Sequence, residues 1–297
     1  MRSVVKRVLA RHRCQRCVLQ AHEKVDEPMS DSTSLNETST SGPANWLPFV
    51  LPLALYLLLG FFEPKFTADA PANITAQQSV QVVGNDKSLL NYEVSEVRRY
   101  VALTVVKFFF VGAILAFYWR VYQQHFALAT DGLAWAVGVS GAVLWIGLCA
   151  LASEPRLVAW AGVDASVLGQ RSQFNPFQQI DSTIWRGFFI AARFGLLVII
   201  VPLAEELFLR GFLMRAVHSG QWLKVRFKDI GWAGLICGTG YGVLTHPNEA
   251  VAALVWFSLL SWLMLRTGKF WNCVVAHAVT NGLLGLYVVR YGQWQLW

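Results

Sequence analysis

The chain has 297 residues, of which 55% are apolar and only 14% charged, and it is rich in Trp and Phe. This composition argues against two soluble domains and is typical of a single polytopic helical membrane protein. The apolar runs are continuous and far longer than the roughly 10-residue alternating strands of a membrane barrel, which argues against that fold. The formal net charge of +7 is concentrated in the amino-terminal tail and in short loops. Basic residues in such places mark cytoplasmic membrane flanks and not a nucleic-acid-binding face.

The amino-terminal segment 1–45 is basic first and then rich in Ser, Thr and Asn. It has no periodic apolar pattern, so we predict a disordered tail on the cytoplasmic side. It also lacks the apolar core of an export signal. Met29 is a second candidate start, because a polar leader of ordinary composition follows it. The integral membrane domain is predicted to cover residues 46–297, with its catalytic helices at about 180–290.

Seven apolar segments after the tail predict an all-α bundle with about seven or eight spans. Polar external loops are expected at 63–96, with a hairpin turn at Gly84-Asn85, and at 152–184, with a surface helix. A basic loop at 224–228 is expected in the cytoplasm. The segments are 46–62, 100–118, 133–151, 185–204 with a continuation to about 217, 231–246, 250–265 and 270–289.

The fourth span ends in the sequence VPLAEELFLRGFLMR, which places Glu205, Glu206 and Arg210 in or near the membrane. One ionisable residue near the bilayer centre costs about 2.5 to 3.5 kcal/mol, so three together require compensation. Residues four apart share a helix face, which predicts that Glu206 pairs with Arg210 while Glu205 points elsewhere. Pro202 is expected to kink the helix and to change the direction of Glu205.

Polar residues of three spans fall at similar predicted depths. With a helical rise of about 1.5 Å per residue from the cytoplasmic edge, Glu205 lies roughly 18 Å deep, His246 roughly 22 Å, His277 roughly 10 Å and Asn281 roughly 17 Å. These groups suit the hydrolysis of a peptide bond. Glu205 would take a proton from water, while His277 and Asn281 would donate hydrogen bonds to the oxyanion. His246 would orient the water or bind a metal.

Three short motifs carry a resemblance to a known family. EELFLR at 205–210, His246 on the next span and HAVTN at 277–281 resemble EExxxR, FxxxH and HxxxN of the CAAX protease and bacteriocin-processing family, which includes the type II CAAX prenyl endopeptidases. The resemblance covers about 180–290 and implies an intramembrane protease whose first Glu and histidines act on water. It implies a peptide or protein substrate that is lipidated or membrane-anchored.

The resemblance assigns catalytic positions to Glu205, Glu206, His246, His277 and Asn281, with Arg210 as an orienting residue. It leaves open whether a divalent metal such as zinc takes part, as in a metalloprotease, and His246 and His277 are the expected ligands in that case. One position departs from the pattern. Four residues before His246 the family has Phe, whereas this chain has Gly242 with Tyr241 beside it. The aromatic residue is therefore interpreted as displaced by one position.

Two other classes of function remain as alternatives. The sequence Gly-Val-Ser-Gly at 138–141 has the form of the rhomboid nucleophile motif, with Ser140 as nucleophile and His277 as base. Small residues at this spacing also allow close helix packing without any chemistry. In the second alternative, Arg193, Glu205 and His246 form a proton relay in a transporter, or the chain is a non-catalytic membrane scaffold. We find no inverted repeat that would support transport.

Overall fold

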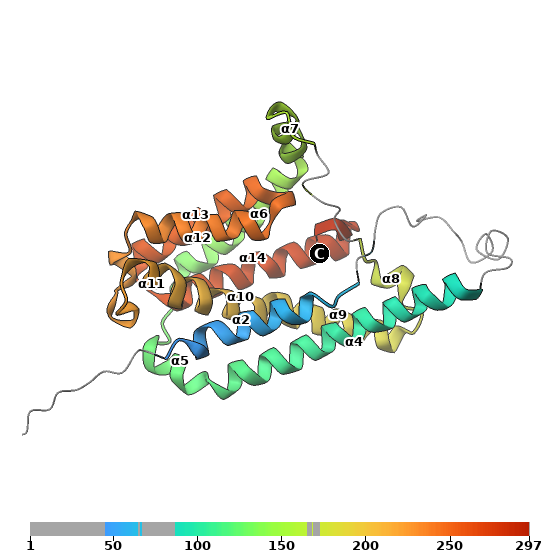
Figure 1. The fold of residues 1–297 in the computed structure, drawn as a ribbon, viewed down its shortest axis with the longest axis horizontal. Helices are drawn as coiled ribbons and strands as arrows, with labels where there is room; N and C mark the ends of the chain where they lie inside the picture. Colours follow the sequence, from blue (N-terminus) through green and yellow to red (C-terminus); the bar gives the residue numbers. More distant parts are fainter. Residues whose placement is uncertain (1–44, 65, 67–86, 165–167, 169–172, 297) are drawn as a thin grey trace, which may run out of the picture. The chain divides into compact units, whose positions relative to one another are not determined.

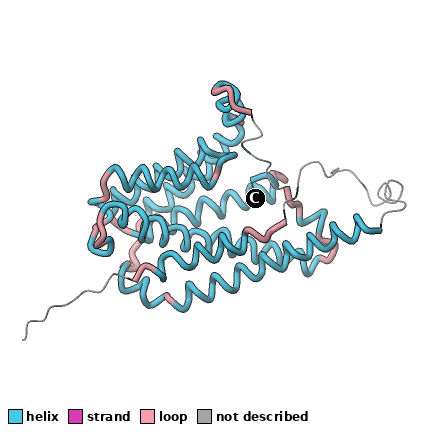
Figure 2. The backbone as a smooth tube through the Cα atoms, in the orientation of Figure 1, coloured by secondary structure: helices cyan, strands magenta, loops and turns pink. Residues whose placement is uncertain are grey.

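The computed structural model describes residues 45–64, 66, 87–164, 168 and 173–296. Within these ranges the chain is helical and contains no strand, as predicted (Figure 2). The predicted tail 1–45, apart from its last residue, and the predicted hairpin turn lie outside the described residues. The elements are α2 Leu47–Gly60, α4 Lys87–Phe117, α5 Trp119–His125, α6 Gly132–Ala150, α7 Ser153–Trp160, α8 Pro176–Gln179, α9 Thr183–Gly195, η2 Leu196–Ile200, α10 Val201–Glu206, η3 Leu207–Leu213, α11 Met214–His218, η4 Trp222–Lys224, η5 Phe227–Asp229, α12 Trp232–Thr245, η6 Pro247–Glu249, α13 Ala250–Thr267, α14 Phe270–Tyr291 and η7 Trp294–Leu296.

Five helical segments of the described chain are long and apolar enough to cross a membrane. They are Val94–Phe117, Gly132–Ala150, Thr183–His218, Pro247–Thr267 and Phe270–Tyr291. The other two predicted spans are the 14-residue helices α2 and α12. At about 1.5 Å per residue, each measures roughly 21 Å, which is shorter than a bilayer core of about 30 Å. Helix α2 is apolar and packs on α4, whereas α12 contains several glycines and threonines and packs on α13, an arrangement compatible with the predicted span count.

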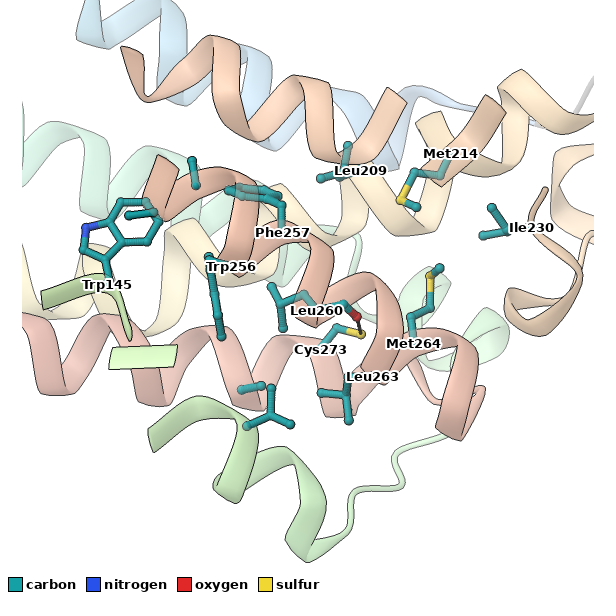
Figure 3. Packing of buried hydrophobic residues seen from close by; sticks show 14 residues of the cluster. Trp145, Leu209, Met214, Ile230, Trp256, Phe257, Leu260, Leu263, Met264 and Cys273 are labelled. Carbon is teal, nitrogen blue, oxygen red and sulfur yellow. Dashed lines mark hydrogen bonds between the residues drawn. The ribbon is translucent and has the colours of Figure 1, made fainter. Parts of the chain in front are cut away.

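The carboxy-terminal helix α14 occupies the centre of the helical bundle. It packs against α6 and α13 and also against η2 and α10 (Figure 1). The core between α13, α14 and their neighbours is filled by Trp256, Phe257, Leu260 and Cys273 (Figure 3). Helix α14 therefore joins the part of the bundle that carries the two glutamates to the part that contains α6 and α13.

The segment Thr183–His218 is one continuous helix with two π-helical stretches, η2 and η3. Ser182 begins it as an N-cap, since its hydroxyl accepts from the Trp185 amide at 3.5 Å. A π-helical stretch adds a residue to the turn and rotates the residues that follow, and such stretches are frequent at functional sites. Glu205 and Glu206 lie on the short α-helical segment between the two. The predicted continuation of this span through the Glu-Glu pair is confirmed.

One predicted boundary was wrong, and one short helix was not predicted. The loop expected at 63–96 is shorter, because α4 already begins at Lys87. The short helix α5 follows the second span and was not expected. The expected surface helix in 152–184 is present as α7 and α8. Helix α7 is attached to the bundle by Glu154, whose Oε1 accepts from the Val251 amide at 3.1 Å and so caps the first turn of α13.

Asp131, just before α6, binds the first turn of α14. Its carboxylate accepts from Asn272 Nδ2 and from Lys269 Nζ, both at 3.1 Å, and its amide donates to Asn272 Oδ1. The hydrogen bonds from Asn272 and Lys269 lower the pKa of the Asp131 carboxyl. The folded state therefore prefers the ionised carboxylate. Its contribution to stability is present above the unfolded-state pKa of about 3.9 and is lost as the pH falls through the lower folded-state pKa.

We expect Asp131→Asn to lower the free energy of unfolding by about 1 kcal/mol at pH 7, since the ion pair is partly exposed and screened. The difference between the variant and the wild type should shrink as the pH falls from about 4 through the lower folded-state pKa, below which Asp131 is protonated and uncharged like the asparagine. Thermal unfolding in detergent at a series of pH values measures this difference. A difference that stays constant down to pH 3 would contradict the assignment.

Candidate active site

A buried ion pair lies at the centre of the site. Arg210 Nη1 donates to Glu206 Oε2 at 2.6 Å, and these two side chains are 1% and 0% exposed. The predicted pairing of these residues, one turn apart on the same helix, is confirmed. Glu206 has a second partner that the sequence did not predict, because His277 Nδ1 lies 2.9 Å from its Oε1. Both carboxylate oxygens of Glu206 are thus engaged, one by Arg210 of the same helix and one by His277 of α14.

Glu205 points away from the ion pair and is the more accessible of the two glutamates. Its side chain is 12% exposed, and its Oε2 lies 3.7 Å from His277 Nε2. Its Oε1 accepts a hydrogen bond at 3.3 Å from the hydroxyl of Tyr241 on α12. The imidazole of His277 therefore lies between the two carboxylates, with one nitrogen toward each (Glu206 and Glu205).

A glycine face on α12 allows this helix to approach its neighbours. Gly234, Gly238 and Gly242 recur every four residues and are buried. A Cβ at Gly238 would lie 2.7 Å from the Met214 sulfur, and one at Gly242 would lie 2.2 Å from the ring of Phe257. Such small residues let backbones come close in membrane bundles. The position where the family motif has Phe is thus filled here by a ring from α13.

Phe257 lies among the polar groups of the site. Its ring centroid is 6.0 Å from that of His246 and 6.2 Å from that of Tyr241. The guanidinium carbon of Arg210 lies 6.0 Å from the same ring. The displaced aromatic residue inferred from the sequence, Tyr241, is beside this ring and contacts Glu205. The sequence predicted neither the position of Phe257 in the site nor the contact of Tyr241 with Glu205. The only signal in the sequence was the glycine at a position where an aromatic residue was expected.

Gly242→Ala should destabilise the protein by about 1 to 3 kcal/mol, because its methyl group would overlap the Phe257 ring. Gly240 on the same helix is the matched control, since a Cβ there meets nothing within 4 Å. Gly240→Ala should be neutral or slightly stabilising, because alanine favours the helix. Melting temperatures in detergent compare the two variants. Equal effects at both positions would contradict the packing described here.

Asn281 lies one turn beyond His277 on α14 and donates from Nδ2 to the Leu197 carbonyl at 3.0 Å. At the end of η2, the Val201 amide donates a hydrogen bond to the Leu196 carbonyl, five residues earlier in the chain. The next donor in that register would be Pro202, which has no N–H. The Leu197 carbonyl thus lacks its helical donor, and Asn281 supplies one. One N–H of the amide therefore stabilises the helix of the two glutamates, and the second remains for another acceptor.

His246 ends α12, where the helix stops before Pro247. Its Nδ1 lies 3.0 Å from the Gly242 carbonyl, and its ring meets Trp145 edge-on at 5.4 Å between centroids. Among the described residues, the structure brings both glutamates into contact with His277, and Arg210 into contact with Glu206. It records no hydrogen bond from His246 to this group.

The rhomboid alternative does not fit the arrangement on α6. The Ser140 side chain is exposed, whereas His277 is buried and engaged with Glu206. The two glycines of the motif serve packing, because a Cβ at Gly138 would lie 2.7 Å from Val279 and one at Gly141 would lie 2.1 Å from Trp256. The motif at 138–141 is therefore interpreted as a contact between α6 and its neighbours.

The expected metal ligands do not form a site in the described part of the chain. No group of three or more His, Cys, Asp or Glu side chains there is arranged to hold a metal ion, whereas a catalytic zinc ordinarily has three protein ligands. His277 and His246 each have only Nδ1 engaged, by Glu206 and by the Gly242 carbonyl, but two imidazoles alone do not complete such a site. These residues do not fit the predicted metal, and we derive no step through one.

The apolar helices and the buried charged cluster define an integral membrane protein with an ionisable site inside a helical bundle. Residues 184–283 match the family model of the type II CAAX prenyl endopeptidases, described as Rce1-like. The resemblance inferred from three motifs is thereby confirmed for this part of the chain, and it supports a CAAX intramembrane protease. No curated protein and no solved structure matched the chain.

Proposed function

We propose that the chain is an intramembrane endopeptidase in which Glu205 activates the attacking water. One observation carries this proposal. Of two adjacent glutamates, Glu206 is saturated by Arg210 and His277, while Glu205 is 12% exposed and lies 3.7 Å from a His277 nitrogen. Glu206 alone is sufficient to neutralise Arg210 and hold the fold together, so the ion pair does not explain the presence of Glu205. The accessible carboxylate of Glu205 can contact a substrate and water.

The charges of the cluster support the same assignment of roles. With ionised Glu205 and Glu206, a guanidinium at Arg210 and an imidazolium at His277, the four side chains sum to zero. An unbalanced charge buried in the bundle would cost several kcal/mol. In this state His277 donates Nδ1–H to Glu206 and keeps an Nε2–H on the side of Glu205. That N–H is a suitable donor for a developing negative charge.

The proposed hydrolysis proceeds in two steps. In the first, Glu205 takes a proton from water, the water oxygen bonds to the scissile carbonyl carbon, and the carbonyl oxygen becomes an oxyanion. His277 Nε2–H and the second amide N–H of Asn281 donate hydrogen bonds to that oxyanion. In the second, the carbon–nitrogen bond breaks, and the proton held by Glu205 passes to the leaving nitrogen. The nucleophile and both products are thereby accounted for.

Glu206 and His246 take supporting roles in this proposal. Glu206 orients the His277 imidazole through its Nδ1, as a carboxylate orients a catalytic histidine in other hydrolases. His246 has its Nε2 available for the water or the substrate, since its Nδ1 faces Gly242. The substrate is a membrane-anchored or lipidated peptide or protein, and membrane lipid surrounds the apolar helices. The amino terminus is expected in the cytoplasm, and the site is expected to open toward the same side.

Mass spectrometry of peptides tests the proposal and identifies the substrate class. Membranes that contain the wild type or Glu205→Gln are incubated with a peptide ending in a farnesylated CAAX sequence, and the endogenous peptides are compared in the same samples. We expect fragments that appear only with the wild type. Identical peptide sets from the two proteins would contradict peptidase activity and favour the scaffold or transporter alternative.

A further inference from the structure

The hydroxyl of Tyr241 is the one group from α12 that bonds to Glu205 in the described chain, through Oε1 at 3.3 Å. Glu205 Oε2 faces His277 Nε2 at 3.7 Å. The two oxygens of Glu205 are therefore distinguished, one held by a phenol and the other directed at the imidazole. A carboxylate with one oxygen fixed has fewer orientations available, and orientation of a reacting group contributes directly to the rate.

The surroundings of Tyr241 hold its ring in place. The ring lies between two phenylalanines, with centroids 5.8 Å from Phe208 and 6.2 Å from Phe257. Gly242, the next residue, allows the Phe257 ring to lie directly against the α12 backbone. Its hydroxyl has no other hydrogen bond within the described ranges. The ring packing and the glycine face thus direct the phenol at the glutamate.

We infer that Tyr241 is a positioning residue for Glu205, which orients its carboxylate for the attack of water. The inference rests on the proposed function, because it assigns Tyr241 a role through Glu205. In the proposed reaction the phenol keeps its proton and donates to Oε1, while Oε2 takes the proton from water. Tyr241 exchanges no atom with the substrate, so its removal should lower the rate of the chemical step and leave substrate binding unchanged.

Tyr241→Phe removes the hydroxyl and keeps the ring contacts with Phe208 and Phe257. With a farnesylated CAAX peptide as substrate in detergent, we expect kcat to fall about 10-fold or more, since the lost hydrogen bond is to a charged group. KM should stay within about 2-fold and the melting temperature should be unchanged. Tyr287→Phe is the matched control, ten residues after His277 on α14, where the ring contacts only that of Tyr291 among the described aromatic residues. It should retain full activity.

A readout that needs no turnover accompanies the kinetics. Isotope-edited infrared spectroscopy of labelled glutamate, compared with Glu205→Gln to assign the band, should show the Glu205 carboxylate band shifted by Tyr241→Phe and not by Tyr287→Phe. An unshifted band, unchanged kcat, or a loss of thermal stability parallel to the loss of activity would overturn the inference. If Glu205→Gln itself retains turnover, the proposed function fails. If Glu205→Gln is inactive and Tyr241→Phe is fully active, only the role of Tyr241 fails.

Discussion

Glu205→Gln should abolish cleavage while the protein still folds and inserts. Glutamine has the shape of glutamate and retains an oxygen that can accept from Tyr241, but it cannot take a proton from water. General base catalysis commonly contributes about 10²- to 10⁴-fold to a rate, so kcat should fall by at least that range. Folding should be retained, because Glu205 is outside the tight ion pair of Glu206 and Arg210.

The measurement is release of the carboxy-terminal fragment from a farnesylated CAAX peptide by purified protein. Glu96→Gln is the matched control, since Glu96 pairs with Arg99 at 2.8 Å on α4, apart from the cluster. The control should cleave at the wild-type rate. Cleavage by Glu205→Gln at more than about a tenth of the wild-type rate would remove Glu205 from the role of general base.

The parts of this fold that depend on local sequence were predictable. The length of an apolar run fixes a helix, and α13 and α14 lie within two residues of their predicted ends. The pairing of Glu206 with Arg210 was also predictable, because residues four apart on a helix meet regardless of the rest of the fold. Pro202 was expected to kink the helix near the glutamates; the structure has π-helical stretches on both sides of α10, and the kink itself stays a prediction. The form of that irregularity, a π-helical stretch completed by Asn281, depends on a helix 84 residues away.

The side-chain contacts between different helices of the site could not be predicted from the sequence. The second partner of Glu206 comes from α14, and the hydrogen bond to Glu205 comes from α12. A depth estimate placed His246 in the same band as Glu205, but depth along an axis does not fix direction around it. His246 lies at the end of α12 between Trp145 and Phe257. The departure at Gly242 became interpretable only when Phe257 was found in the space that a side chain there would enter.

Arg210→Ala should destabilise the protein by about 3 to 5 kcal/mol, because it leaves the cluster of Glu205, Glu206 and His277 with one unbalanced buried negative charge. The Arg210 side chain is 1% exposed and donates from Nη1 to Glu206 at 2.6 Å, so solvent cannot replace it. Size-exclusion chromatography should show a smaller folded fraction, and the melting temperature in detergent should fall by roughly 10 °C. The matched control is Arg226→Ala, which breaks an exposed pair with Asp229 at 3.2 Å. Such a pair contributes less than about 1 kcal/mol.

A double variant separates the fold from the chemistry. Glu206→Gln with Arg210→Met removes both buried charges and keeps an oxygen that can accept from His277 Nδ1. Replacing a buried ion pair by uncharged groups is often neutral, so this protein should be more stable than Arg210→Ala. It leaves Glu205 and His277 as a neutral pair and should keep measurable activity if Glu206 only orients the imidazole. If Arg210→Ala melts at the wild-type temperature, the ion pair does not stabilise the bundle. The burial of Glu206 beside Glu205 would then have no explanation in the stability of the fold.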